Sequence, residues 1–109
     1  MRDYSKAQKR EMRRLAGIAH ERELTREMSV LSDSFAAWQR SEFTVFDLEG
    51  RIHRFLTGPA KQLQLFYTAR NDDFKVARAI ASGVLNRDEV DPDLLVALRD
   101  SIDFAAERL

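Results

Sequence analysis

The fold is decided by residues 24–38, which run LTREMSVLSDSFAAW. Apolar side chains recur in this stretch at alternating steps of four and three, which places them along one stripe of an α-helix. They are Leu24, Met28, Leu31, Phe35 and Trp38. Neither Gly nor Pro interrupts the stretch, and residues 3–40 hold no Pro and only Gly17. The spacing therefore predicts one long helix, or two shorter ones, over about residues 3–40.

The apolar residues upstream of this stretch lie on a different side of the same helix. At about 100° per residue, Met12, Leu15 and Ala19 fall opposite the 24–38 stripe, together with Tyr4. A straight helix cannot turn both sets toward one core. Either the helix breaks near Gly17, or residues 1–20 project as an arm and place their apolar side on another molecule. We favour the arm.

Start and stop signals predict four further helices. Thr44 is placed as an N-cap, with Asp47 three residues later to complete a capping box. Gly58 and Pro59 end that helix and begin a third over about 59–69.

A fourth helix follows Asn71 or Asp72 and stops at Gly83, which is a candidate left-handed C-terminal cap. The pair Asp91-Pro92 starts a last helix that continues to residue 109. We thus predict an all-α fold, a compact bundle of about five helices with a long, charged N-terminal helix. The predicted division is a basic helical arm over 1–20 and a bundle domain over 21–109.

Composition agrees with a single folded domain. Of the 109 residues, 44% are hydrophobic and 33% are charged, and the formal net charge is zero. The chain has no cysteine, which excludes disulfides and thiolate metal sites and suits a reducing compartment. No apolar run has the length of a membrane span or of a secretory signal. We expect a cytoplasmic protein that does not enter membranes.

Motifs for chemistry are missing, so we predict that the chain is not an enzyme and has no cofactor. Four scattered glycines build neither a phosphate loop nor a dinucleotide turn, and no serine lies in a nucleophile elbow. His20 with Glu23 or Glu27, and His53 with Glu49, offer one imidazole and one carboxylate per helix. The Glu-x-x-His order that di-iron bundles use is absent from both, so no metal site is predicted.

A basic stripe covers the first helix. It consists of Arg2, Lys6, Lys9, Arg10, Arg13 and Arg14. One basic helix face is what contact with phosphates requires. Against nucleic-acid binding stand the sequence pI of about 6.7 and the lack of an aromatic stacking platform. A solvated face is the commoner meaning of such a stripe.

Two functional hypotheses remain. The first is a protein-interaction or regulatory module that binds a protein partner or itself through its N-terminal helix. Its candidate partner-binding residues are Met12, Leu15, Ala19 and Trp38, the last because it closes its stripe at a helix end. The second is a nucleic-acid-binding regulator that uses residues 2–14. In helical content, size and charged leading segment the chain resembles small bacterial regulatory or adaptor proteins, including some toxin-neutralising partners.

Overall fold

The computed structural model describes residues 3–109, and every regular element in that range is a helix. In chain order these are α1 (Lys6–Gln39), α2 (Val45–Thr57), α3 (Pro59–Thr68), α4 (Asp72–Ala81), the 3₁₀ helix η1 (Arg87–Glu89), α5 (Pro92–Ala97) and α6 (Arg99–Ala106). The predicted all-α class and the long N-terminal helix are confirmed. The last predicted helix is divided, because Leu98 leaves the helical conformation between α5 and α6.

The predicted helix ends match the observed caps. The side chain of Thr44 accepts from the backbone N–H of Asp47, and the Asp47 carboxylate accepts from the backbone N–H of Thr44. The side chain of Asp91 accepts from the N–H of Asp93 at the start of α5. Gly83 follows α4 with φ +82°, the left-handed conformation expected of it. These local signals fix where the helices begin and end.

The turn between α1 and α2 is also built locally. Ser41 adopts φ +61°, a left-handed conformation that L-residues other than Gly adopt at a cost. Its N–H bonds the carbonyl of Trp38, and the N–H of Glu42 bonds the carbonyl of Ala37. This is the Schellman pattern, which satisfies the last carbonyl groups of α1 and reverses the chain.

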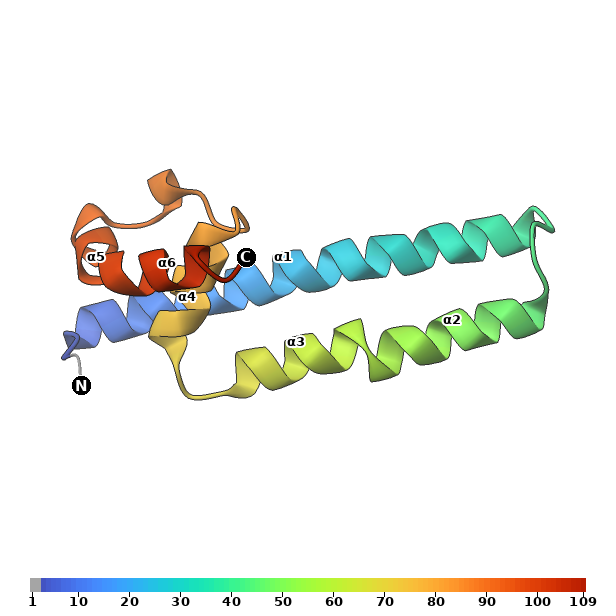
Figure 1. The fold of residues 1–109 in the computed structure, drawn as a ribbon, viewed down its shortest axis with the longest axis horizontal. Coiled ribbons are helices and arrows are strands. Elements are labelled where there is room, and N and C mark those ends of the chain that lie inside the picture. Colours follow the sequence, from blue (N-terminus) through green and yellow to red (C-terminus); the bar gives the residue numbers. More distant parts are fainter. Residues whose placement is uncertain (1–2) are drawn as a thin grey trace. The chain divides into compact units, whose positions relative to one another are not determined.

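The described chain divides into two units, and α1 contributes to both. The first, here called the core unit, joins the start of α1, up to His20, with the segment Ala69–Leu109. In Figure 1 the helices α4, α5 and α6 gather around this part of α1. Of the eighteen buried apolar residues, fifteen belong to the core unit, so most of the described hydrophobic core lies there.

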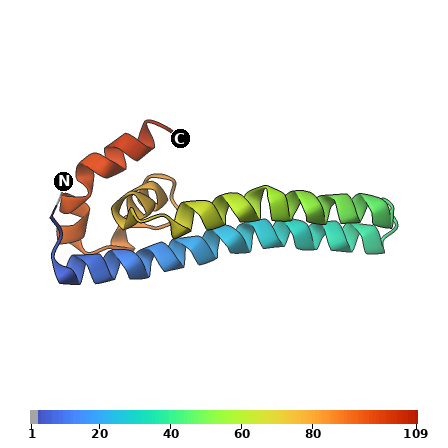
Figure 2. The same ribbon diagram turned by 90° about the horizontal axis from the view of Figure 1, so that it is seen from below.

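The second unit, here called the hairpin, spans Glu21–Thr68. Figures 1 and 2 both show the second part of α1 running antiparallel beside α2 and α3. Only three apolar residues of the hairpin are buried: Leu48, Phe55 and Tyr67. The hydroxyl of Tyr67 donates to the carboxylate of Glu23, which links α3 to α1. The hairpin is thus a single layer in which α1 lies beside α2 and α3, and it has little hydrophobic core of its own.

The predicted arm over residues 1–20 is wrong in the range that the structure describes. Met12, Leu15 and Ala19 are only 3%, 1% and 0% exposed, and they belong to the same unit as residues 69–109. The helix does not break at Gly17 either. The change of apolar side along α1 is real, but its cause is that the two halves of the helix serve two different units of one chain. Residues 21–109 are accordingly not a domain separate from residues 1–20.

No helix within residues 3–109 has both the length and the apolar character needed to cross a lipid bilayer.

Candidate protein-docking face

An apolar face of the hairpin remains open to solvent. It consists of Leu24, Met28 and Phe35 on α1, with Val45, Ile52 and Leu56 on α2; we call it the hairpin face. Four of these residues are about half exposed: Met28 is 48% exposed, Phe35 40%, Val45 51% and Leu56 59%. Seven of the ten exposed large hydrophobic residues in the described chain lie in the hairpin, although it holds less than half of the residues. Much of the apolar surface of the hairpin is therefore not covered by another element of the described chain.

Helix geometry places these side chains on one side of the hairpin. At about 100° per residue, the three residues on each helix fall within about 40° of one another. The seam is the line of contact between the two helices, where Leu31 and Ser34 of α1 face Phe55 of α2. Viewed from the N-terminal end of each helix, the three face residues of that helix lie about 70° clockwise from the seam. Because the two helices are antiparallel, two clockwise offsets seen from opposite ends point to the same side. The two apolar rows thus form a single face.

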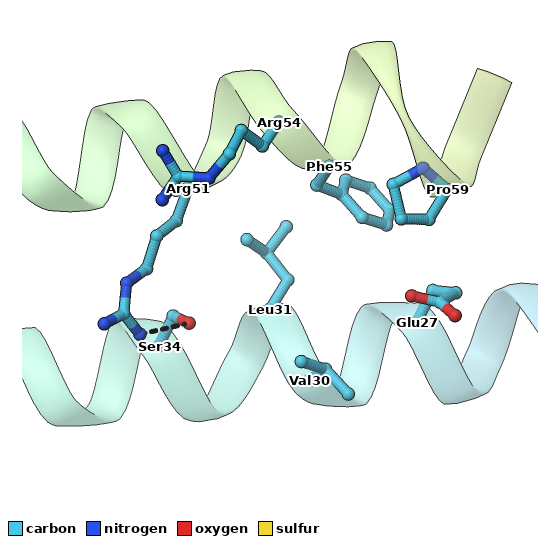
Figure 3. Close-up of a pocket in the computed structure, with 8 residues that line it drawn as sticks. All are labelled: Glu27, Val30, Leu31, Ser34, Arg51, Arg54, Phe55 and Pro59. Atoms are coloured by element: carbon cyan, nitrogen blue, oxygen red, sulfur yellow. Dashed lines mark hydrogen bonds between the residues drawn. The ribbon is translucent and has the colours of Figure 1, made fainter.

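The other side of the hairpin carries a groove of mixed polar and apolar lining, which we call the arginine groove. It has a volume of about 280 Å³, and Figure 3 shows its lining residues. They are Glu27, Val30, Leu31, Ser34, Arg51, Arg54, Phe55 and Pro59. On this side of the hairpin, charged side chains stand beside apolar ones, whereas the two rows of the hairpin face are apolar alone.

Arg51 has its partners within the hairpin. It donates from Nη1 to the Ser34 hydroxyl at 3.2 Å. Its guanidinium carbon also lies 4.0 Å from the ring centroid of Phe43. These two contacts hold the side chain between α1 and α2, where it ties the helices together. Glu27 places a carboxylate in the same groove, so the groove is not a purely cationic site.

The predicted basic stripe is exposed on the core unit. Lys6, Lys9, Arg10 and Arg13 are all exposed along α1. Arg14 is exposed too, but it donates from Nε to a carboxylate oxygen of Glu11 at 3.0 Å, and this hydrogen bond lowers the pKa of Glu11. Arg2 lies outside the described residues. The cations are thus available to a polyanion, with one of them already paired.

Acidic groups approach this stripe on one edge. A cavity of about 270 Å³ brings Lys9 and Arg13 together with Asp72 and Asp73 of α4. The hydroxyl of Tyr4 donates to Asp73 at 3.3 Å, which fixes the start of the described chain against α4. At that edge a phosphate backbone laid over the stripe would meet Arg70 as well as two carboxylates, and one of these carboxylates, that of Asp72, is paired with Lys75 at 2.9 Å.

Of the predicted partner-binding residues, three are unsuited to that role. Met12, Leu15 and Ala19 are enclosed in the core unit and present no surface to another molecule. Trp38 is half-buried at the loop end of α1, in line with the hairpin seam. It borders the hairpin face without being part of it, and its role as an anchor stays a prediction.

Sequence reasoning missed the hairpin face because it treated the 24–38 stripe as one apolar side that packs into a core. A signal was present. Val45, Ile52 and Leu56 repeat at steps of seven and four beside the Leu48 and Phe55 row, so the apolar sector of α2 is wider than one neighbouring helix covers. An apolar sector of that width indicates two packing partners, and the hairpin supplies one.

No group of three or more His, Asp or Glu side chains within residues 3–109 is arranged to hold a metal ion. No known family model matches the sequence, and neither the curated proteins nor the solved structures contain a protein that matches it.

Proposed function

We propose that this chain is a non-enzymatic protein-interaction module that binds an apolar helical surface of another polypeptide through the hairpin face. One observation carries the proposal: four large apolar side chains of the hairpin face are 40% exposed or more, while the whole hairpin buries only three apolar side chains. Contiguous exposed apolar surface of this kind usually marks a binding site in soluble proteins. The hydrophobic term then favours association in proportion to the area covered.

The proposal moves the binding surface away from residues 1–20. The segment expected to bind is the middle of the chain, with α1 and α2 contributing equally. Helices that pack side by side interlock through side chains spaced three and four residues apart, and the hairpin face offers two such rows. A regulatory or scaffolding role in the cytoplasm is in keeping with the cysteine-free sequence and the absence of catalytic motifs from it.

Site-specific photo-crosslinking in the cells that make the protein tests the proposal. A benzophenone amino acid at position 56 should form adducts with another polypeptide chain. The matched control is position 46, because Phe46 is 78% exposed on the same helix but lies outside the hairpin face. Adducts from position 46 with none from position 56 would refute the proposal. Equal yields from both positions would also count against it.

The second candidate function is nucleic-acid binding through the basic stripe. The observation in its favour is that Lys6, Lys9, Arg10 and Arg13 are all exposed on one helix. Anisotropy titrations with generic DNA and RNA at low salt should show binding that weakens steeply as salt rises. The variant Arg10→Glu/Arg13→Glu should lose that binding. If the unmodified chain binds neither nucleic acid at 20 mM salt, the candidate is refuted.

A further inference from the structure

We infer that the occupant of the hairpin face is a second copy of this chain, so that two hairpins form a four-helix bundle. This inference rests on the proposed function and names its partner. Two features of the described hairpin indicate that another surface covers the face. The hairpin buries three apolar side chains and so has little core, and four of the six face residues are 40% exposed or more.

The size of the face suits a dimer at the lower end of the range of protein interfaces. With about 200 Å² for a fully exposed large side chain, the four most exposed residues present about 400 Å² of surface. The stretch of α1 inside the hairpin is about 28 Å long, and two helices side by side are about 20 Å wide. Packed over its whole length, such a side has a footprint of about 560 Å², which is close to the roughly 600 Å² per partner at the lower end of specific protein interfaces.

The face is also able to pack against a copy of itself, because both of its rows are apolar. Its two rows have the same length, from Leu24 to Phe35 and from Val45 to Leu56, which are twelve residues each. Glu21 and Glu49 lie at its outer edges and no charged side chain lies between the rows. A twofold axis in the plane of contact then brings apolar rows against apolar rows with no buried charge. The twofold axis can run along the helices or across them. In both cases, helices that pack against each other across the interface are antiparallel, which is the usual arrangement in four-helix bundles.

Availability favours a second copy over a different protein. Exposed apolar residues favour aggregation unless something covers them whenever the chain is folded. A second copy is present wherever the chain is made, at the concentration of the chain itself, and mass action then favours the dimer. A different partner, chosen by charge, would require charged groups within the face, and the face has none between its rows.

Two matched double variants of the full chain test the inference by light scattering and analytical ultracentrifugation. The unmodified chain should have twice its 12.6 kDa mass at about 100 µM. Met28→Lys/Leu56→Lys should raise the dissociation constant at least about 100-fold and give a monomer, because each lysine would be buried without a partner. Val30→Lys/Phe46→Lys changes two residues that are more exposed, on the same two helices but outside the face, and should stay dimeric.

A second measurement does not depend on how the lysine variants fold. The chain has no cysteine, so single substitutions Leu56→Cys and Phe46→Cys each give a unique thiol. At about 100 µM the thiol at position 56 should react with a maleimide at least about tenfold more slowly than the thiol at position 46, because the dimer covers it. The two rates should converge on dilution.

Several results would overturn the inference. They are a monomeric unmodified chain at about 100 µM, a monomer from both double variants, a dimer that survives Met28→Lys/Leu56→Lys, or equal thiol reactivity at high concentration. A monomeric chain whose position 56 crosslinks to a different protein in cells would refute the second copy and leave the proposed function standing. No adduct from position 56 would refute both.

Discussion

Replacing Leu15 with alanine should unfold the core unit far more readily while leaving the hairpin intact. Leu15 is 1% exposed and is among the largest fully buried side chains of the described chain. It lies on the segment that the sequence assigned to a projecting arm. The substitution therefore separates the two accounts of α1: a side chain in a core, or one side of a helix that awaits a partner.

The expected cost follows from burial. Covering a leucine side chain contributes about 1.5–3 kcal/mol, and the cavity left by truncation adds to the loss. Substitutions of this kind at buried sites cost about 2–5 kcal/mol, so we expect about 3 kcal/mol for Leu15→Ala. The control is Val96→Ala in the same unit, where the side chain is 64% exposed and the cost should stay below about 0.5 kcal/mol.

Amide hydrogen exchange read by mass spectrometry measures each unit by itself. A loss of about 3 kcal/mol should speed exchange about 100-fold at the slowest amides of α4 and α6, which exchange when the core unit opens. Amides of α2 should exchange at their original rate, because α2 belongs to the hairpin. If the exchange rates in α4 and α6 change by less than about twofold, Leu15 does not pack in their core. That result would support the projecting arm instead.

Four further changes have defined outcomes; amide exchange checks the first, and urea or thermal unfolding checks the other three. Deleting residues 1–20 removes one wall of the core unit and should abolish slow amide exchange in Ala69–Leu109, where an arm would be dispensable. Gly17→Ala should stabilise the chain by about 0.5–1 kcal/mol, since Gly17 is mid-helix and an added methyl group meets open space; a loss of stability would contradict this. Ser41→Gly should stabilise by about 0.5–1 kcal/mol, because glycine adopts φ +61° without strain, and an unchanged midpoint would disprove the cost assigned to Ser41. Gly83→Ala should destabilise by about 1 kcal/mol for the converse reason, and any gain in stability would refute it.

Local structure was predictable from the sequence where a few neighbouring residues decide it. The capping box of Thr44, the break before Pro59, the left-handed Gly83 and the start at Asp91 each depend on contacts within three or four positions. The division of the last helix at Leu98 was not predictable in this way. Leu98 is fully buried, and the apolar spacing around it is compatible with an unbroken helix.

The candidate site was harder to predict because it depends on which distant segment covers which side of α1. The apolar pattern correctly shows that Leu15 and Met28 point in different directions. It does not show that the segment after residue 68 returns to cover Leu15, while Met28 keeps an open side. Two sets of apolar residues with opposite directions look alike in sequence, and only the long-range packing distinguishes the covered set from the exposed one.

The discontinuous composition of the core unit has a consequence for synthesis on the ribosome. The helix that carries Leu15 is made early, but the segment that encloses it ends at residue 109. At a translation rate of about 5–20 residues per second, the apolar side of that helix stays exposed for roughly 5–20 s before the segment that buries it has been synthesised. The hairpin, whose residues are consecutive, is complete well before then. In nascent chains the hairpin should thus form before the core unit. Chaperones that recognise apolar segments should bind near the amino terminus.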